Sequence, residues 1–302
     1  MNDNSPTYGG QAVIEGVMMR GTQSCAIAMR APAQNIVIHT EPLTGIYKSK
    51  IRQIPFLRGL VVLWDALGLG VRALTISANT QTGEDEKIEG PALYLTLGIS
   101  LTFGIGLFFL APAALAQFSE RFLGAGEAAA SWTTAWWGNL LEGLLRLAIL
   151  IGYVWLVGRI PEIRRVFAYH GAEHKTINAY EAGVELTPEN VSRFSVEHPR
   201  CGTAFLLTLV VVSVLIFSLL GPLPIGLRLL SRIIFLPVAA GLAYEYIRWT
   251  ARHLNSPLVK LLVRPNLALQ HLTTREPSLD MLEVSIAAFN AMRSNEEQQV
   301  AV

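Results

Sequence analysis

The run LYLTLGISLTFGIGLFFLAPAALA, residues 93–116, contains no charged side chain. A transmembrane helix needs about 20 consecutive apolar residues, so this run is long enough to cross a bilayer. Three further runs are mainly apolar: Trp132–Gly158, which contains Glu142 and Arg146; Thr203–Leu220, which has no charged residue; and Ile225–Trp249, which is uncharged from Ile233 to Tyr244. The runs pair into two hairpins, residues 91–158 and 203–250. The sequence therefore predicts a mainly α, multi-pass membrane protein with four transmembrane helices.

The overall composition agrees with membrane insertion. Of the 302 residues, 51% are hydrophobic and 16% are charged, whereas a soluble domain has about 25% charged residues. The net charge of +1 gives no indication of a nucleic-acid partner. The two cysteines, Cys25 and Cys201, lie far apart in the sequence, which is not a disulfide framework and fits a reducing compartment. We also expect no cleavable signal peptide at the polar start of the chain.

The basic residues between the apolar runs predict the orientation. They gather in three places: before the first run, between the second and third runs, and at and after the end of the fourth run. The first group includes Lys48, Lys50, Arg52 and Arg58; the second includes Arg159, Arg164, Arg165, Lys175, Arg193 and Arg200; the third includes Arg248, Arg252, Lys260 and Arg264. Basic loops mark the cytoplasmic side of a membrane. We therefore expect both termini to be cytoplasmic in a cell (plasma) membrane, although Arg228 and Arg232 fall at the opposite end of the fourth run.

Three segments outside the runs are expected to be cytoplasmic or interfacial. Residues 1–54 form a β-rich segment with short strands at 12–14, 25–29 and 35–39, separated by glycine and proline, which predicts a small antiparallel sheet. Residues 55–90 form an amphipathic interfacial helix, because Arg58, Asp65 and Arg72 recur every seven residues on one face. A membrane-spanning helix there would have to hide Asp65 at depth, which is costly. Residues 251–302 form amphipathic helices.

The predicted cytoplasmic loop 159–202 contains a potential metal-binding motif. In His170-Gly171-Ala172-Glu173-His174, the two histidines are four residues apart and share one face of a helix, so both can ligate one ion. Glu173 beside them can serve as a general base. This His-x-x-Glu-His order is the inverzincin arrangement. The competing interpretation is that both histidines only form structural hydrogen bonds at the membrane interface.

A catalytic zinc site needs a third protein ligand. His198 and Cys201, in His198-Pro199-Arg200-Cys201, and Glu245 near the inner end of the fourth run are the main candidates, with Glu181 as another. The predicted topology places all of them near the inner membrane face. Each also has a structural interpretation: Cys201 as a small apolar residue, and Glu245 as the ion-pair partner of Arg248 or Arg252.

The N-terminal segment, residues 9–21, is rich in glycine. Its sequence GGQAVIEGVMMRG indicates tight turns or close backbone contacts. Glu15 and Arg20 are candidate site residues, but a glycine-punctuated hairpin with a surface ion pair explains them more simply.

Four motifs carry a resemblance to a known family. The segments GGQAVIEGVMMRG (9–21), YHGAEHKT (169–176), HPRCGT (198–203) and LTTREP (272–277) resemble, in order, those of the bacterial YqhQ-like family. That resemblance implies a multi-pass membrane protein of a kind labelled as a predicted metal-dependent enzyme. Carried over residue by residue, it points to Glu15, His170, Glu173, His174, His198 and Cys201.

These observations lead to three functional hypotheses. The first is a metal-dependent membrane-bound hydrolase, with zinc as the expected ion and its site at the cytoplasmic face. The second is a non-enzymatic scaffold or regulator that binds a cytoplasmic protein partner. The third, a transporter, rests on three ionisable residues within or near the apolar runs: Glu142, Arg146 and Glu245. Glu142 and Arg146 can also pair at a spacing of four on one helix.

Overall fold

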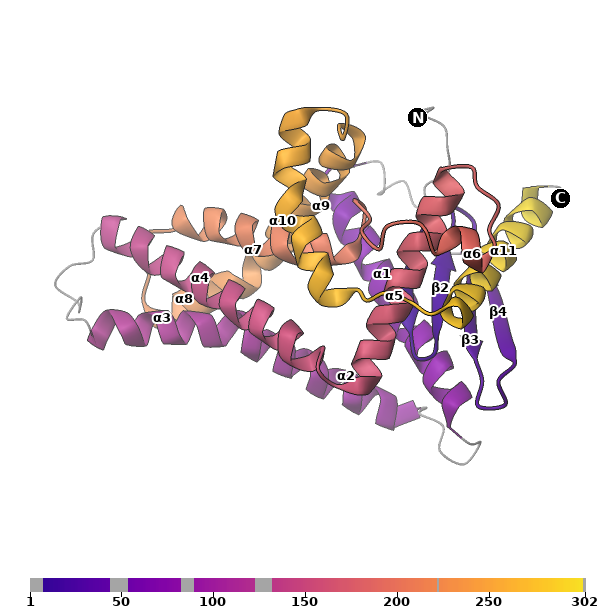
Figure 1. The fold of residues 1–302 in the computed structure, drawn as a ribbon. Helices are drawn as coiled ribbons and strands as arrows, with labels where there is room; N and C mark the ends of the chain where they lie inside the picture. Colours follow the sequence, from indigo (N-terminus) through magenta and orange to yellow (C-terminus); the bar gives the residue numbers. More distant parts are fainter. Residues whose placement is uncertain (1–7, 44–53, 83–89, 123–131, 222, 301–302) are drawn as a thin grey trace.

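The computed structural model describes residues 8–43, 54–82, 90–122, 132–221 and 223–300. Its strands are β1 (Gly9–Val13), β2 (Gly16–Arg20), β3 (Ser24–Arg30) and β4 (Ile36–Pro42). Its first helices are α1 (Leu57–Gln81), α2 (Gly90–Ile105), the π-helix η4 (Gly106–Leu110), α3 (Ala111–Phe122) and α4 (Trp132–Val157). Then follow α5 (Pro161–Glu181), α6 (Pro188–Val191), α7 (Gly202–Ser218), α8 (Ile225–Ile234), α9 (Leu236–Arg252), α10 (Pro257–Thr273) and α11 (Leu279–Val300). In Figure 1 the apolar helices α2, α3, α4 and α7 extend to one side, and the sheet lies on the other with α5 and α11.

The N-terminal sheet is antiparallel, as predicted, with the order β1-β2-β3-β4. Strand β2 was not predicted, because Gly16 suggested a break between strands. Gly16 instead begins the strand opposite Val13. A Cβ on Gly16 would lie 2.2 Å from the Ala28 carbonyl oxygen, so glycine is needed here because β3 passes very close.

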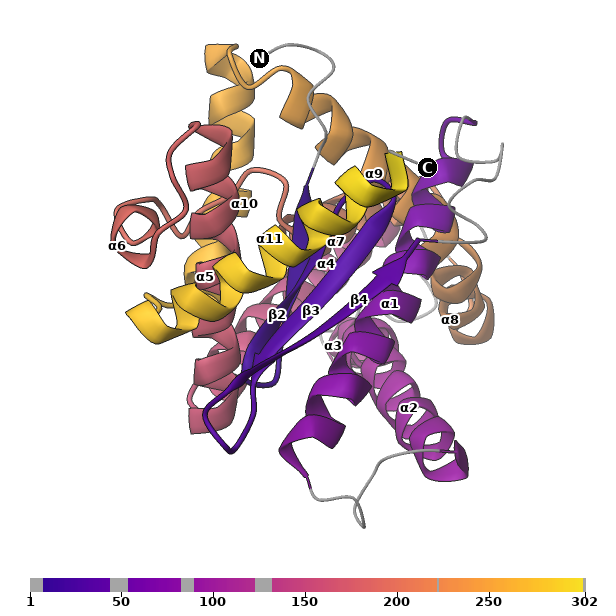
Figure 2. The same cartoon turned by 90° about the vertical axis from the view of Figure 1, so that its right-hand side faces the viewer.

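Both faces of the sheet are covered, which explains why β2 and β3 are buried along their length. Alternate side chains point to opposite faces of a strand. Val17 and Met19 pack with Phe289 of α11 in one core, whereas Met18 packs with Ala73 of α1 in another. Figure 2 shows α11 lying across the sheet. The sheet therefore joins α1 to the C-terminal helix.

The charged stripe of α1 faces the rest of the protein. Arg58 forms an ion pair with Glu245 of α9. The Nη2 of Arg72 lies 2.9 Å from Glu41 of β4, and Asp65 lies 3.2 Å from the Nη2 of Arg20 of β2. All three charged residues of the seven-residue spacing are therefore in ion pairs. On the other side of α1, Trp64 is 74% exposed and Leu67 is 58% exposed. This exposed apolar face supports an interfacial position for α1, although α1 is also long and apolar enough to cross a membrane.

Three helical stretches of the described chain are long and apolar enough to cross a membrane: Leu57–Gln81, Gly90–Ser119 and Trp136–Val157. The last two match predicted spans. The fourth predicted span is divided into α8 and α9, which bend by 43° and count as a further span only if taken together. Pro237 explains the break because proline lacks an N–H and clashes with the preceding turn. The third predicted span, α7, has 17 residues and extends about 26 Å.

Membrane association thus follows from length and composition. The basic residues Lys48, Lys50 and Arg52, which contribute to the predicted orientation, lie outside the described residues.

A buried ion cluster joins α4 to α8. Glu142 and Arg146 pair at 2.8 Å, as their spacing predicted, and both side chains are 2% exposed or less. The carboxylate of Glu142 also accepts hydrogen bonds from Arg228 at 3.3 Å and Arg232 at 2.5 Å. Arg232 donates to Asn139 as well, at 2.7 Å. Arg228 and Arg232, which conflicted with the predicted orientation, therefore have a structural role inside the protein.

We expect Glu142→Gln to destabilise the protein by about 3–5 kcal/mol, because it leaves buried guanidinium groups without their shared carboxylate. Thermal or denaturant unfolding of the purified protein measures the change. Glu297→Gln is the matched control, since Glu297 also pairs with an arginine four residues away but is 68% exposed. It should change stability by less than about 0.5 kcal/mol. Equal effects of the two substitutions would contradict the importance of the cluster.

Candidate metal centre

The histidine motif lies in the middle of α5. Pro161 at the first turn and Glu162 beside it are residues that favour a helix start. The helix then brings the rings of His170 and His174 to a centroid separation of 4.4 Å. The prediction that both histidines share one helix face is confirmed.

Two backbone carbonyls orient these histidines. The Nδ1 of His170 lies 2.9 Å from the Thr273 carbonyl oxygen at the end of α10. The Nδ1 of His174 lies 2.5 Å from the Val196 carbonyl oxygen in the loop after α6. A carbonyl oxygen can only accept, so each Nδ1 carries a proton, and in the neutral form of each ring Nε2 presents a lone pair. Histidines that bind metals characteristically make this type of outer hydrogen bond.

Cys201 contributes the third donor atom. It is the N-cap of α7, where its sulfur accepts a hydrogen bond from the Thr203 backbone N–H at 3.4 Å. The same sulfur lies 3.2 Å from Nε2 of His170. Among the described residues, His170, His174 and Cys201 form the one group of three or more His, Cys, Asp or Glu side chains placed to hold an ion. These three residues are called the donor cluster below.

The donor cluster fits a small tetrahedral ion. Its three donor atoms lie within 4.8 Å of one another. Zinc bonds of roughly 2.0–2.3 Å place tetrahedral ligands about 3.3–3.8 Å apart, so only small side-chain movements are needed to bind the ion. Two imidazoles and one thiolate are donors that zinc commonly uses.

His198 lies beside the donor cluster but outside it. Its ring centroid is 5.6 Å from that of His174. Gln270 of α10 holds the backbone of His198, because it accepts from the N–H and donates to the carbonyl, both at 2.9 Å. Burial, with help from Arg200, lowers the pKa of His198 to about 3, so the ring stays neutral. Its Nε2 is buried without a hydrogen-bond partner among the described residues, and is therefore available to a water or an ion.

Glu173 points in a different direction from the histidines on either side. It lies against β1, where a Cβ on Gly10 would be 3.0 Å from the Glu173 carboxyl carbon. Burial raises the pKa of Glu173 to about 7, while His170 and the Gly10 backbone N–H act in the opposite direction. It does not pair with Lys175, which binds Glu276 at 2.6 Å. The structure therefore separates Glu173 from the donor cluster, and its role as a base stays a prediction.

Three other acidic candidates lie elsewhere. Glu15 is in the β1–β2 turn, and Arg165 of α5 donates to its carboxylate at 2.6 and 2.5 Å. Glu245 pairs with Arg58, not with Arg248 or Arg252 as its structural interpretation supposed. Glu181 pairs with Arg200. Each carboxylate thus links two segments of the fold and none belongs to the donor cluster.

Several residues that support the site had no signal in the sequence. Lys175 is 3% exposed and donates to the carbonyls of Ser192 and Phe194, both at 2.7 Å. Asn178 donates to the carbonyls on either side of Val196, at 2.9 and 3.0 Å. The loop that orients His174 is therefore held by two side chains of α5: Lys175, next to His174, and Asn178, one turn further along the helix.

Comparison with known proteins agrees with these motifs. The family described as "Protein of unknown function (DUF1385)" matches residues 54–295. The chain belongs to this family. A relative called "Uncharacterized protein YqhQ", from Bacillus subtilis (strain 168), is 35% identical, with 95% of this chain and 92% of the relative covered. The predicted YqhQ-like resemblance is thus confirmed. A search of the solved structures finds no match.

The DUF1385 match begins just before α1, so it includes the complete donor cluster, Gln270 and Thr273. The strands of the sheet precede it in the sequence.

We expect Gly171→Ala to disturb both stability and the donor cluster. A Cβ at Gly171 would lie 2.1 Å from the Arg275 carbonyl oxygen, which forces the segment after α10 away from α5 and moves the Thr273 carbonyl that orients His170. Overpacking of this kind costs about 1–3 kcal/mol. Gly202→Ala is the control, since it stands beside Cys201 but its Cβ would meet nothing within 4 Å. Thermal unfolding of both variants checks the prediction, and an unchanged Gly171→Ala protein would contradict it.

Proposed function

We propose that this protein is a membrane protein that binds one divalent metal ion, zinc by its donor set, through His170, His174 and Cys201. The observation that carries the proposal is that backbone carbonyls accept hydrogen bonds from both Nδ1 atoms, which leaves Nε2 of each neutral ring for an ion, while the three donor atoms lie within 4.8 Å of one another. Histidines with a purely structural role would not need carbonyls from two separate segments to set the same tautomer in both rings. The donor chemistry excludes magnesium and calcium, which prefer oxygen ligands.

The site would lie where the cytoplasm meets the membrane. Cys201 caps α7, a helix made almost entirely of apolar residues. The segment that precedes α7, including all of α5, contains the largest group of basic residues between the apolar helices. Both features support cytoplasmic termini in a plasma membrane and a lipid bilayer around the apolar helices.

Hydrolysis is the reaction class that this donor set supports best. Structural zinc sites have four protein ligands, whereas catalytic zinc sites have three and keep a position for water. A metal in such a site supplies an activated water at neutral pH. His198, neutral and with Nε2 free of protein partners, can accept a hydrogen bond from a water beside the cluster. Glu173 would contribute as a base only if the substrate complex brings its carboxylate within hydrogen-bond reach.

The first test is metal content. Protein purified without chelators should contain one zinc per chain, and the double variant His170→Ala and His174→Ala should lose it. Removing only an outer partner of a ligand costs about 10–100-fold in affinity, so Cys201→Ser should weaken binding by at least about 100-fold. Elemental analysis and competition with a zinc-binding dye measure both quantities. His39→Ala is the control because His39 is exposed on β4.

Absence of metal from the purified protein, together with failure to bind added zinc, would overturn this proposal. Retention of zinc by the double variant would mean that the ion is held elsewhere.

The second test asks whether the site is catalytic or structural. In protein loaded with Co²⁺, an open position lets azide bind and shift the visible absorption bands of the cobalt. We expect this shift in the unsubstituted protein, because three protein ligands leave a position open. If instead azide has no effect until His198→Ala is introduced, then His198 is a fourth ligand and the centre is structural.

A non-enzymatic scaffold that binds a cytoplasmic protein remains the second candidate. The feature that favours it is β4, a strand at the edge of the sheet with Ile38 44% exposed. Exposed edge strands can pair with a strand of another chain. This function predicts a stable protein partner that co-purifies equally well with the double histidine variant, whereas the hydrolase does not require one.

A further inference from the structure

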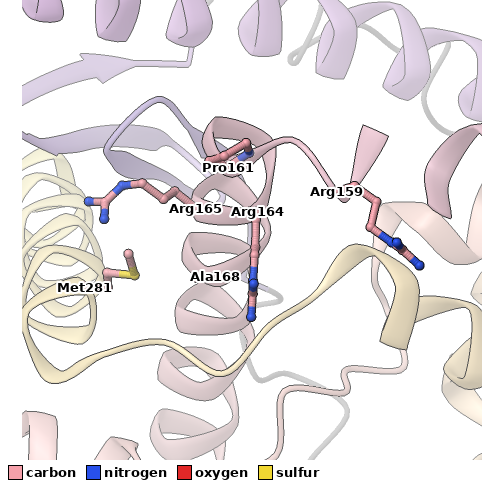
Figure 3. A pocket seen from close by; sticks show the side chains of 6 residues that line it. All are labelled: Arg159, Pro161, Arg164, Arg165, Ala168 and Met281. Carbon is pink, nitrogen blue, oxygen red and sulfur yellow. The ribbon is translucent and has the colours of Figure 1, made fainter. Parts of the chain in front are cut away.

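A basic cavity lies at the beginning of α5, outside the donor cluster. It has a volume of about 310 Å³ and is lined by Arg159, Pro161, Arg164, Arg165, Ala168 and Met281. Figure 3 shows Arg165 extending toward Met281 of α11, with Arg164 on the next position of α5 and Arg159 in the connection from α4. In this view the side chain of Arg159 points away from the side chains of Arg164 and Arg165, and all three arginines are exposed.

The positive charge of this cavity is only partly neutralised. Arg165 pairs with Glu15 at 2.5 Å. Arg159 stacks on Trp155, with its guanidinium carbon 4.0 Å from the ring centroid. Within the described part of the chain, neither Arg159 nor Arg164 forms an ion pair with a carboxylate. Arg159 and Arg164 therefore line the cavity without an ion-paired carboxylate among the described residues, which favours an anionic ligand.

The cavity is distinct from the donor cluster although both use α5. Successive residues of a helix rise about 1.5 Å and turn about 100°. Arg164 and Arg165 therefore precede His170 by about 7–9 Å along the axis and lie about 120–140° around it. A ligand in the cavity would not contact the metal ligands, so the two sites can be tested independently.

The surroundings of the cavity are those of a membrane boundary. It adjoins the end of α4, one of the helices long and apolar enough to cross a bilayer. Trp155, Leu156 and Ile160 around that end are 51%, 62% and 46% exposed. An exposed tryptophan next to arginines, at the end of an apolar helix, is the arrangement found at the level of lipid headgroups.

We propose that this cavity binds the phosphate-bearing headgroup of an anionic phospholipid in the cytoplasmic leaflet. Arg159 and Arg164 would contact the headgroup while the acyl chains lie along the apolar end of α4. A lipid fits better than free phosphate because the guanidinium groups are spread apart and because apolar side chains continue from the cavity. The inference rests on the membrane orientation proposed above, but not on the metal.

The test is lipid binding to the full-length protein in a neutral detergent, followed by native mass spectrometry. Dioleoyl phosphatidylglycerol is the probe, phosphatidylcholine with the same acyl chains is the zwitterionic comparison, and glycerol phosphate is the headgroup without chains. A basic residue near an anionic lipid surface contributes about a fivefold gain in affinity. The double variant Arg159→Gln and Arg164→Gln should therefore bind phosphatidylglycerol about 30-fold more weakly. Arg165 is left intact because it holds Glu15.

Arg252→Gln is the matched control, because Arg252 is also exposed at the end of an apolar helix but does not line the cavity. It should weaken phosphatidylglycerol binding less than twofold. An equal loss in the control would show general attraction rather than a site and would overturn the proposal. Glycerol phosphate binding as tightly as the lipid, or phosphatidylcholine binding as tightly as phosphatidylglycerol, would also overturn it.

Zinc content is measured on the same samples. Loss of phosphatidylglycerol binding with zinc retained is the expected result for the double variant and also shows that its fold is intact. Protein that binds the lipid but no zinc would overturn the metal proposal alone.

Discussion

The carbonyl oxygens of Val196 and Thr273 determine the chemistry that the histidine pair can perform. Each accepts a hydrogen bond from Nδ1 of one histidine, so that in the neutral ring Nε2 carries the lone pair. Without these carbonyls either tautomer would be accessible, and Nε2 of His170, which lies 3.2 Å from the Cys201 sulfur, would not be set as an acceptor. The positions of these carbonyls depend in turn on Lys175, Asn178 and the close approach allowed by Gly171. Much of the local sequence around the motif is therefore explained by two hydrogen bonds.

The geometry of the donor cluster depends on the packing of several segments. The donor atoms and their supports come from α5, the loop after α6, the N-cap of α7 and the end of α10. The first three segments lie within residues 161–201 and the end of α10 follows about 70 residues later, so the four segments meet only when these helices have packed. Metal binding to such a site is coupled to folding, because the unfolded chain does not hold the donors together. A bound ion would consequently stabilise the contact between α5 and the start of α7.

The sequence predicted the donors better than it predicted their surroundings. A spacing of four identifies a histidine pair because helix geometry is local, whereas Cys201 was one of four candidates for the third donor, with His198, Glu245 and Glu181. Val196 and Thr273 act through main-chain oxygens, which every residue has, so no side-chain pattern could reveal them. Glu245 and Glu181 were plausible ligands by position, but Arg58 and Arg200 bind them. Such long-range ion pairs cannot be predicted from sequence spacing. Strand β2 was not predicted because a glycine commonly indicates a turn, whereas Gly16 is needed where β3 passes close to the backbone of β2.

The ionisable residues of the apolar helices also form ion pairs within the protein, and this weakens the transporter hypothesis. A transporter needs charged groups that are free to bind a passing substrate. Glu142 and Arg146 are instead joined to each other and to Arg232, and the pairs are almost fully buried. Glu245 is bound to Arg58. Releasing Glu142 to a substrate would leave buried arginines without their carboxylate, which costs several kcal/mol. The charges that first suggested transport are thus better explained as internal supports of the helical assembly.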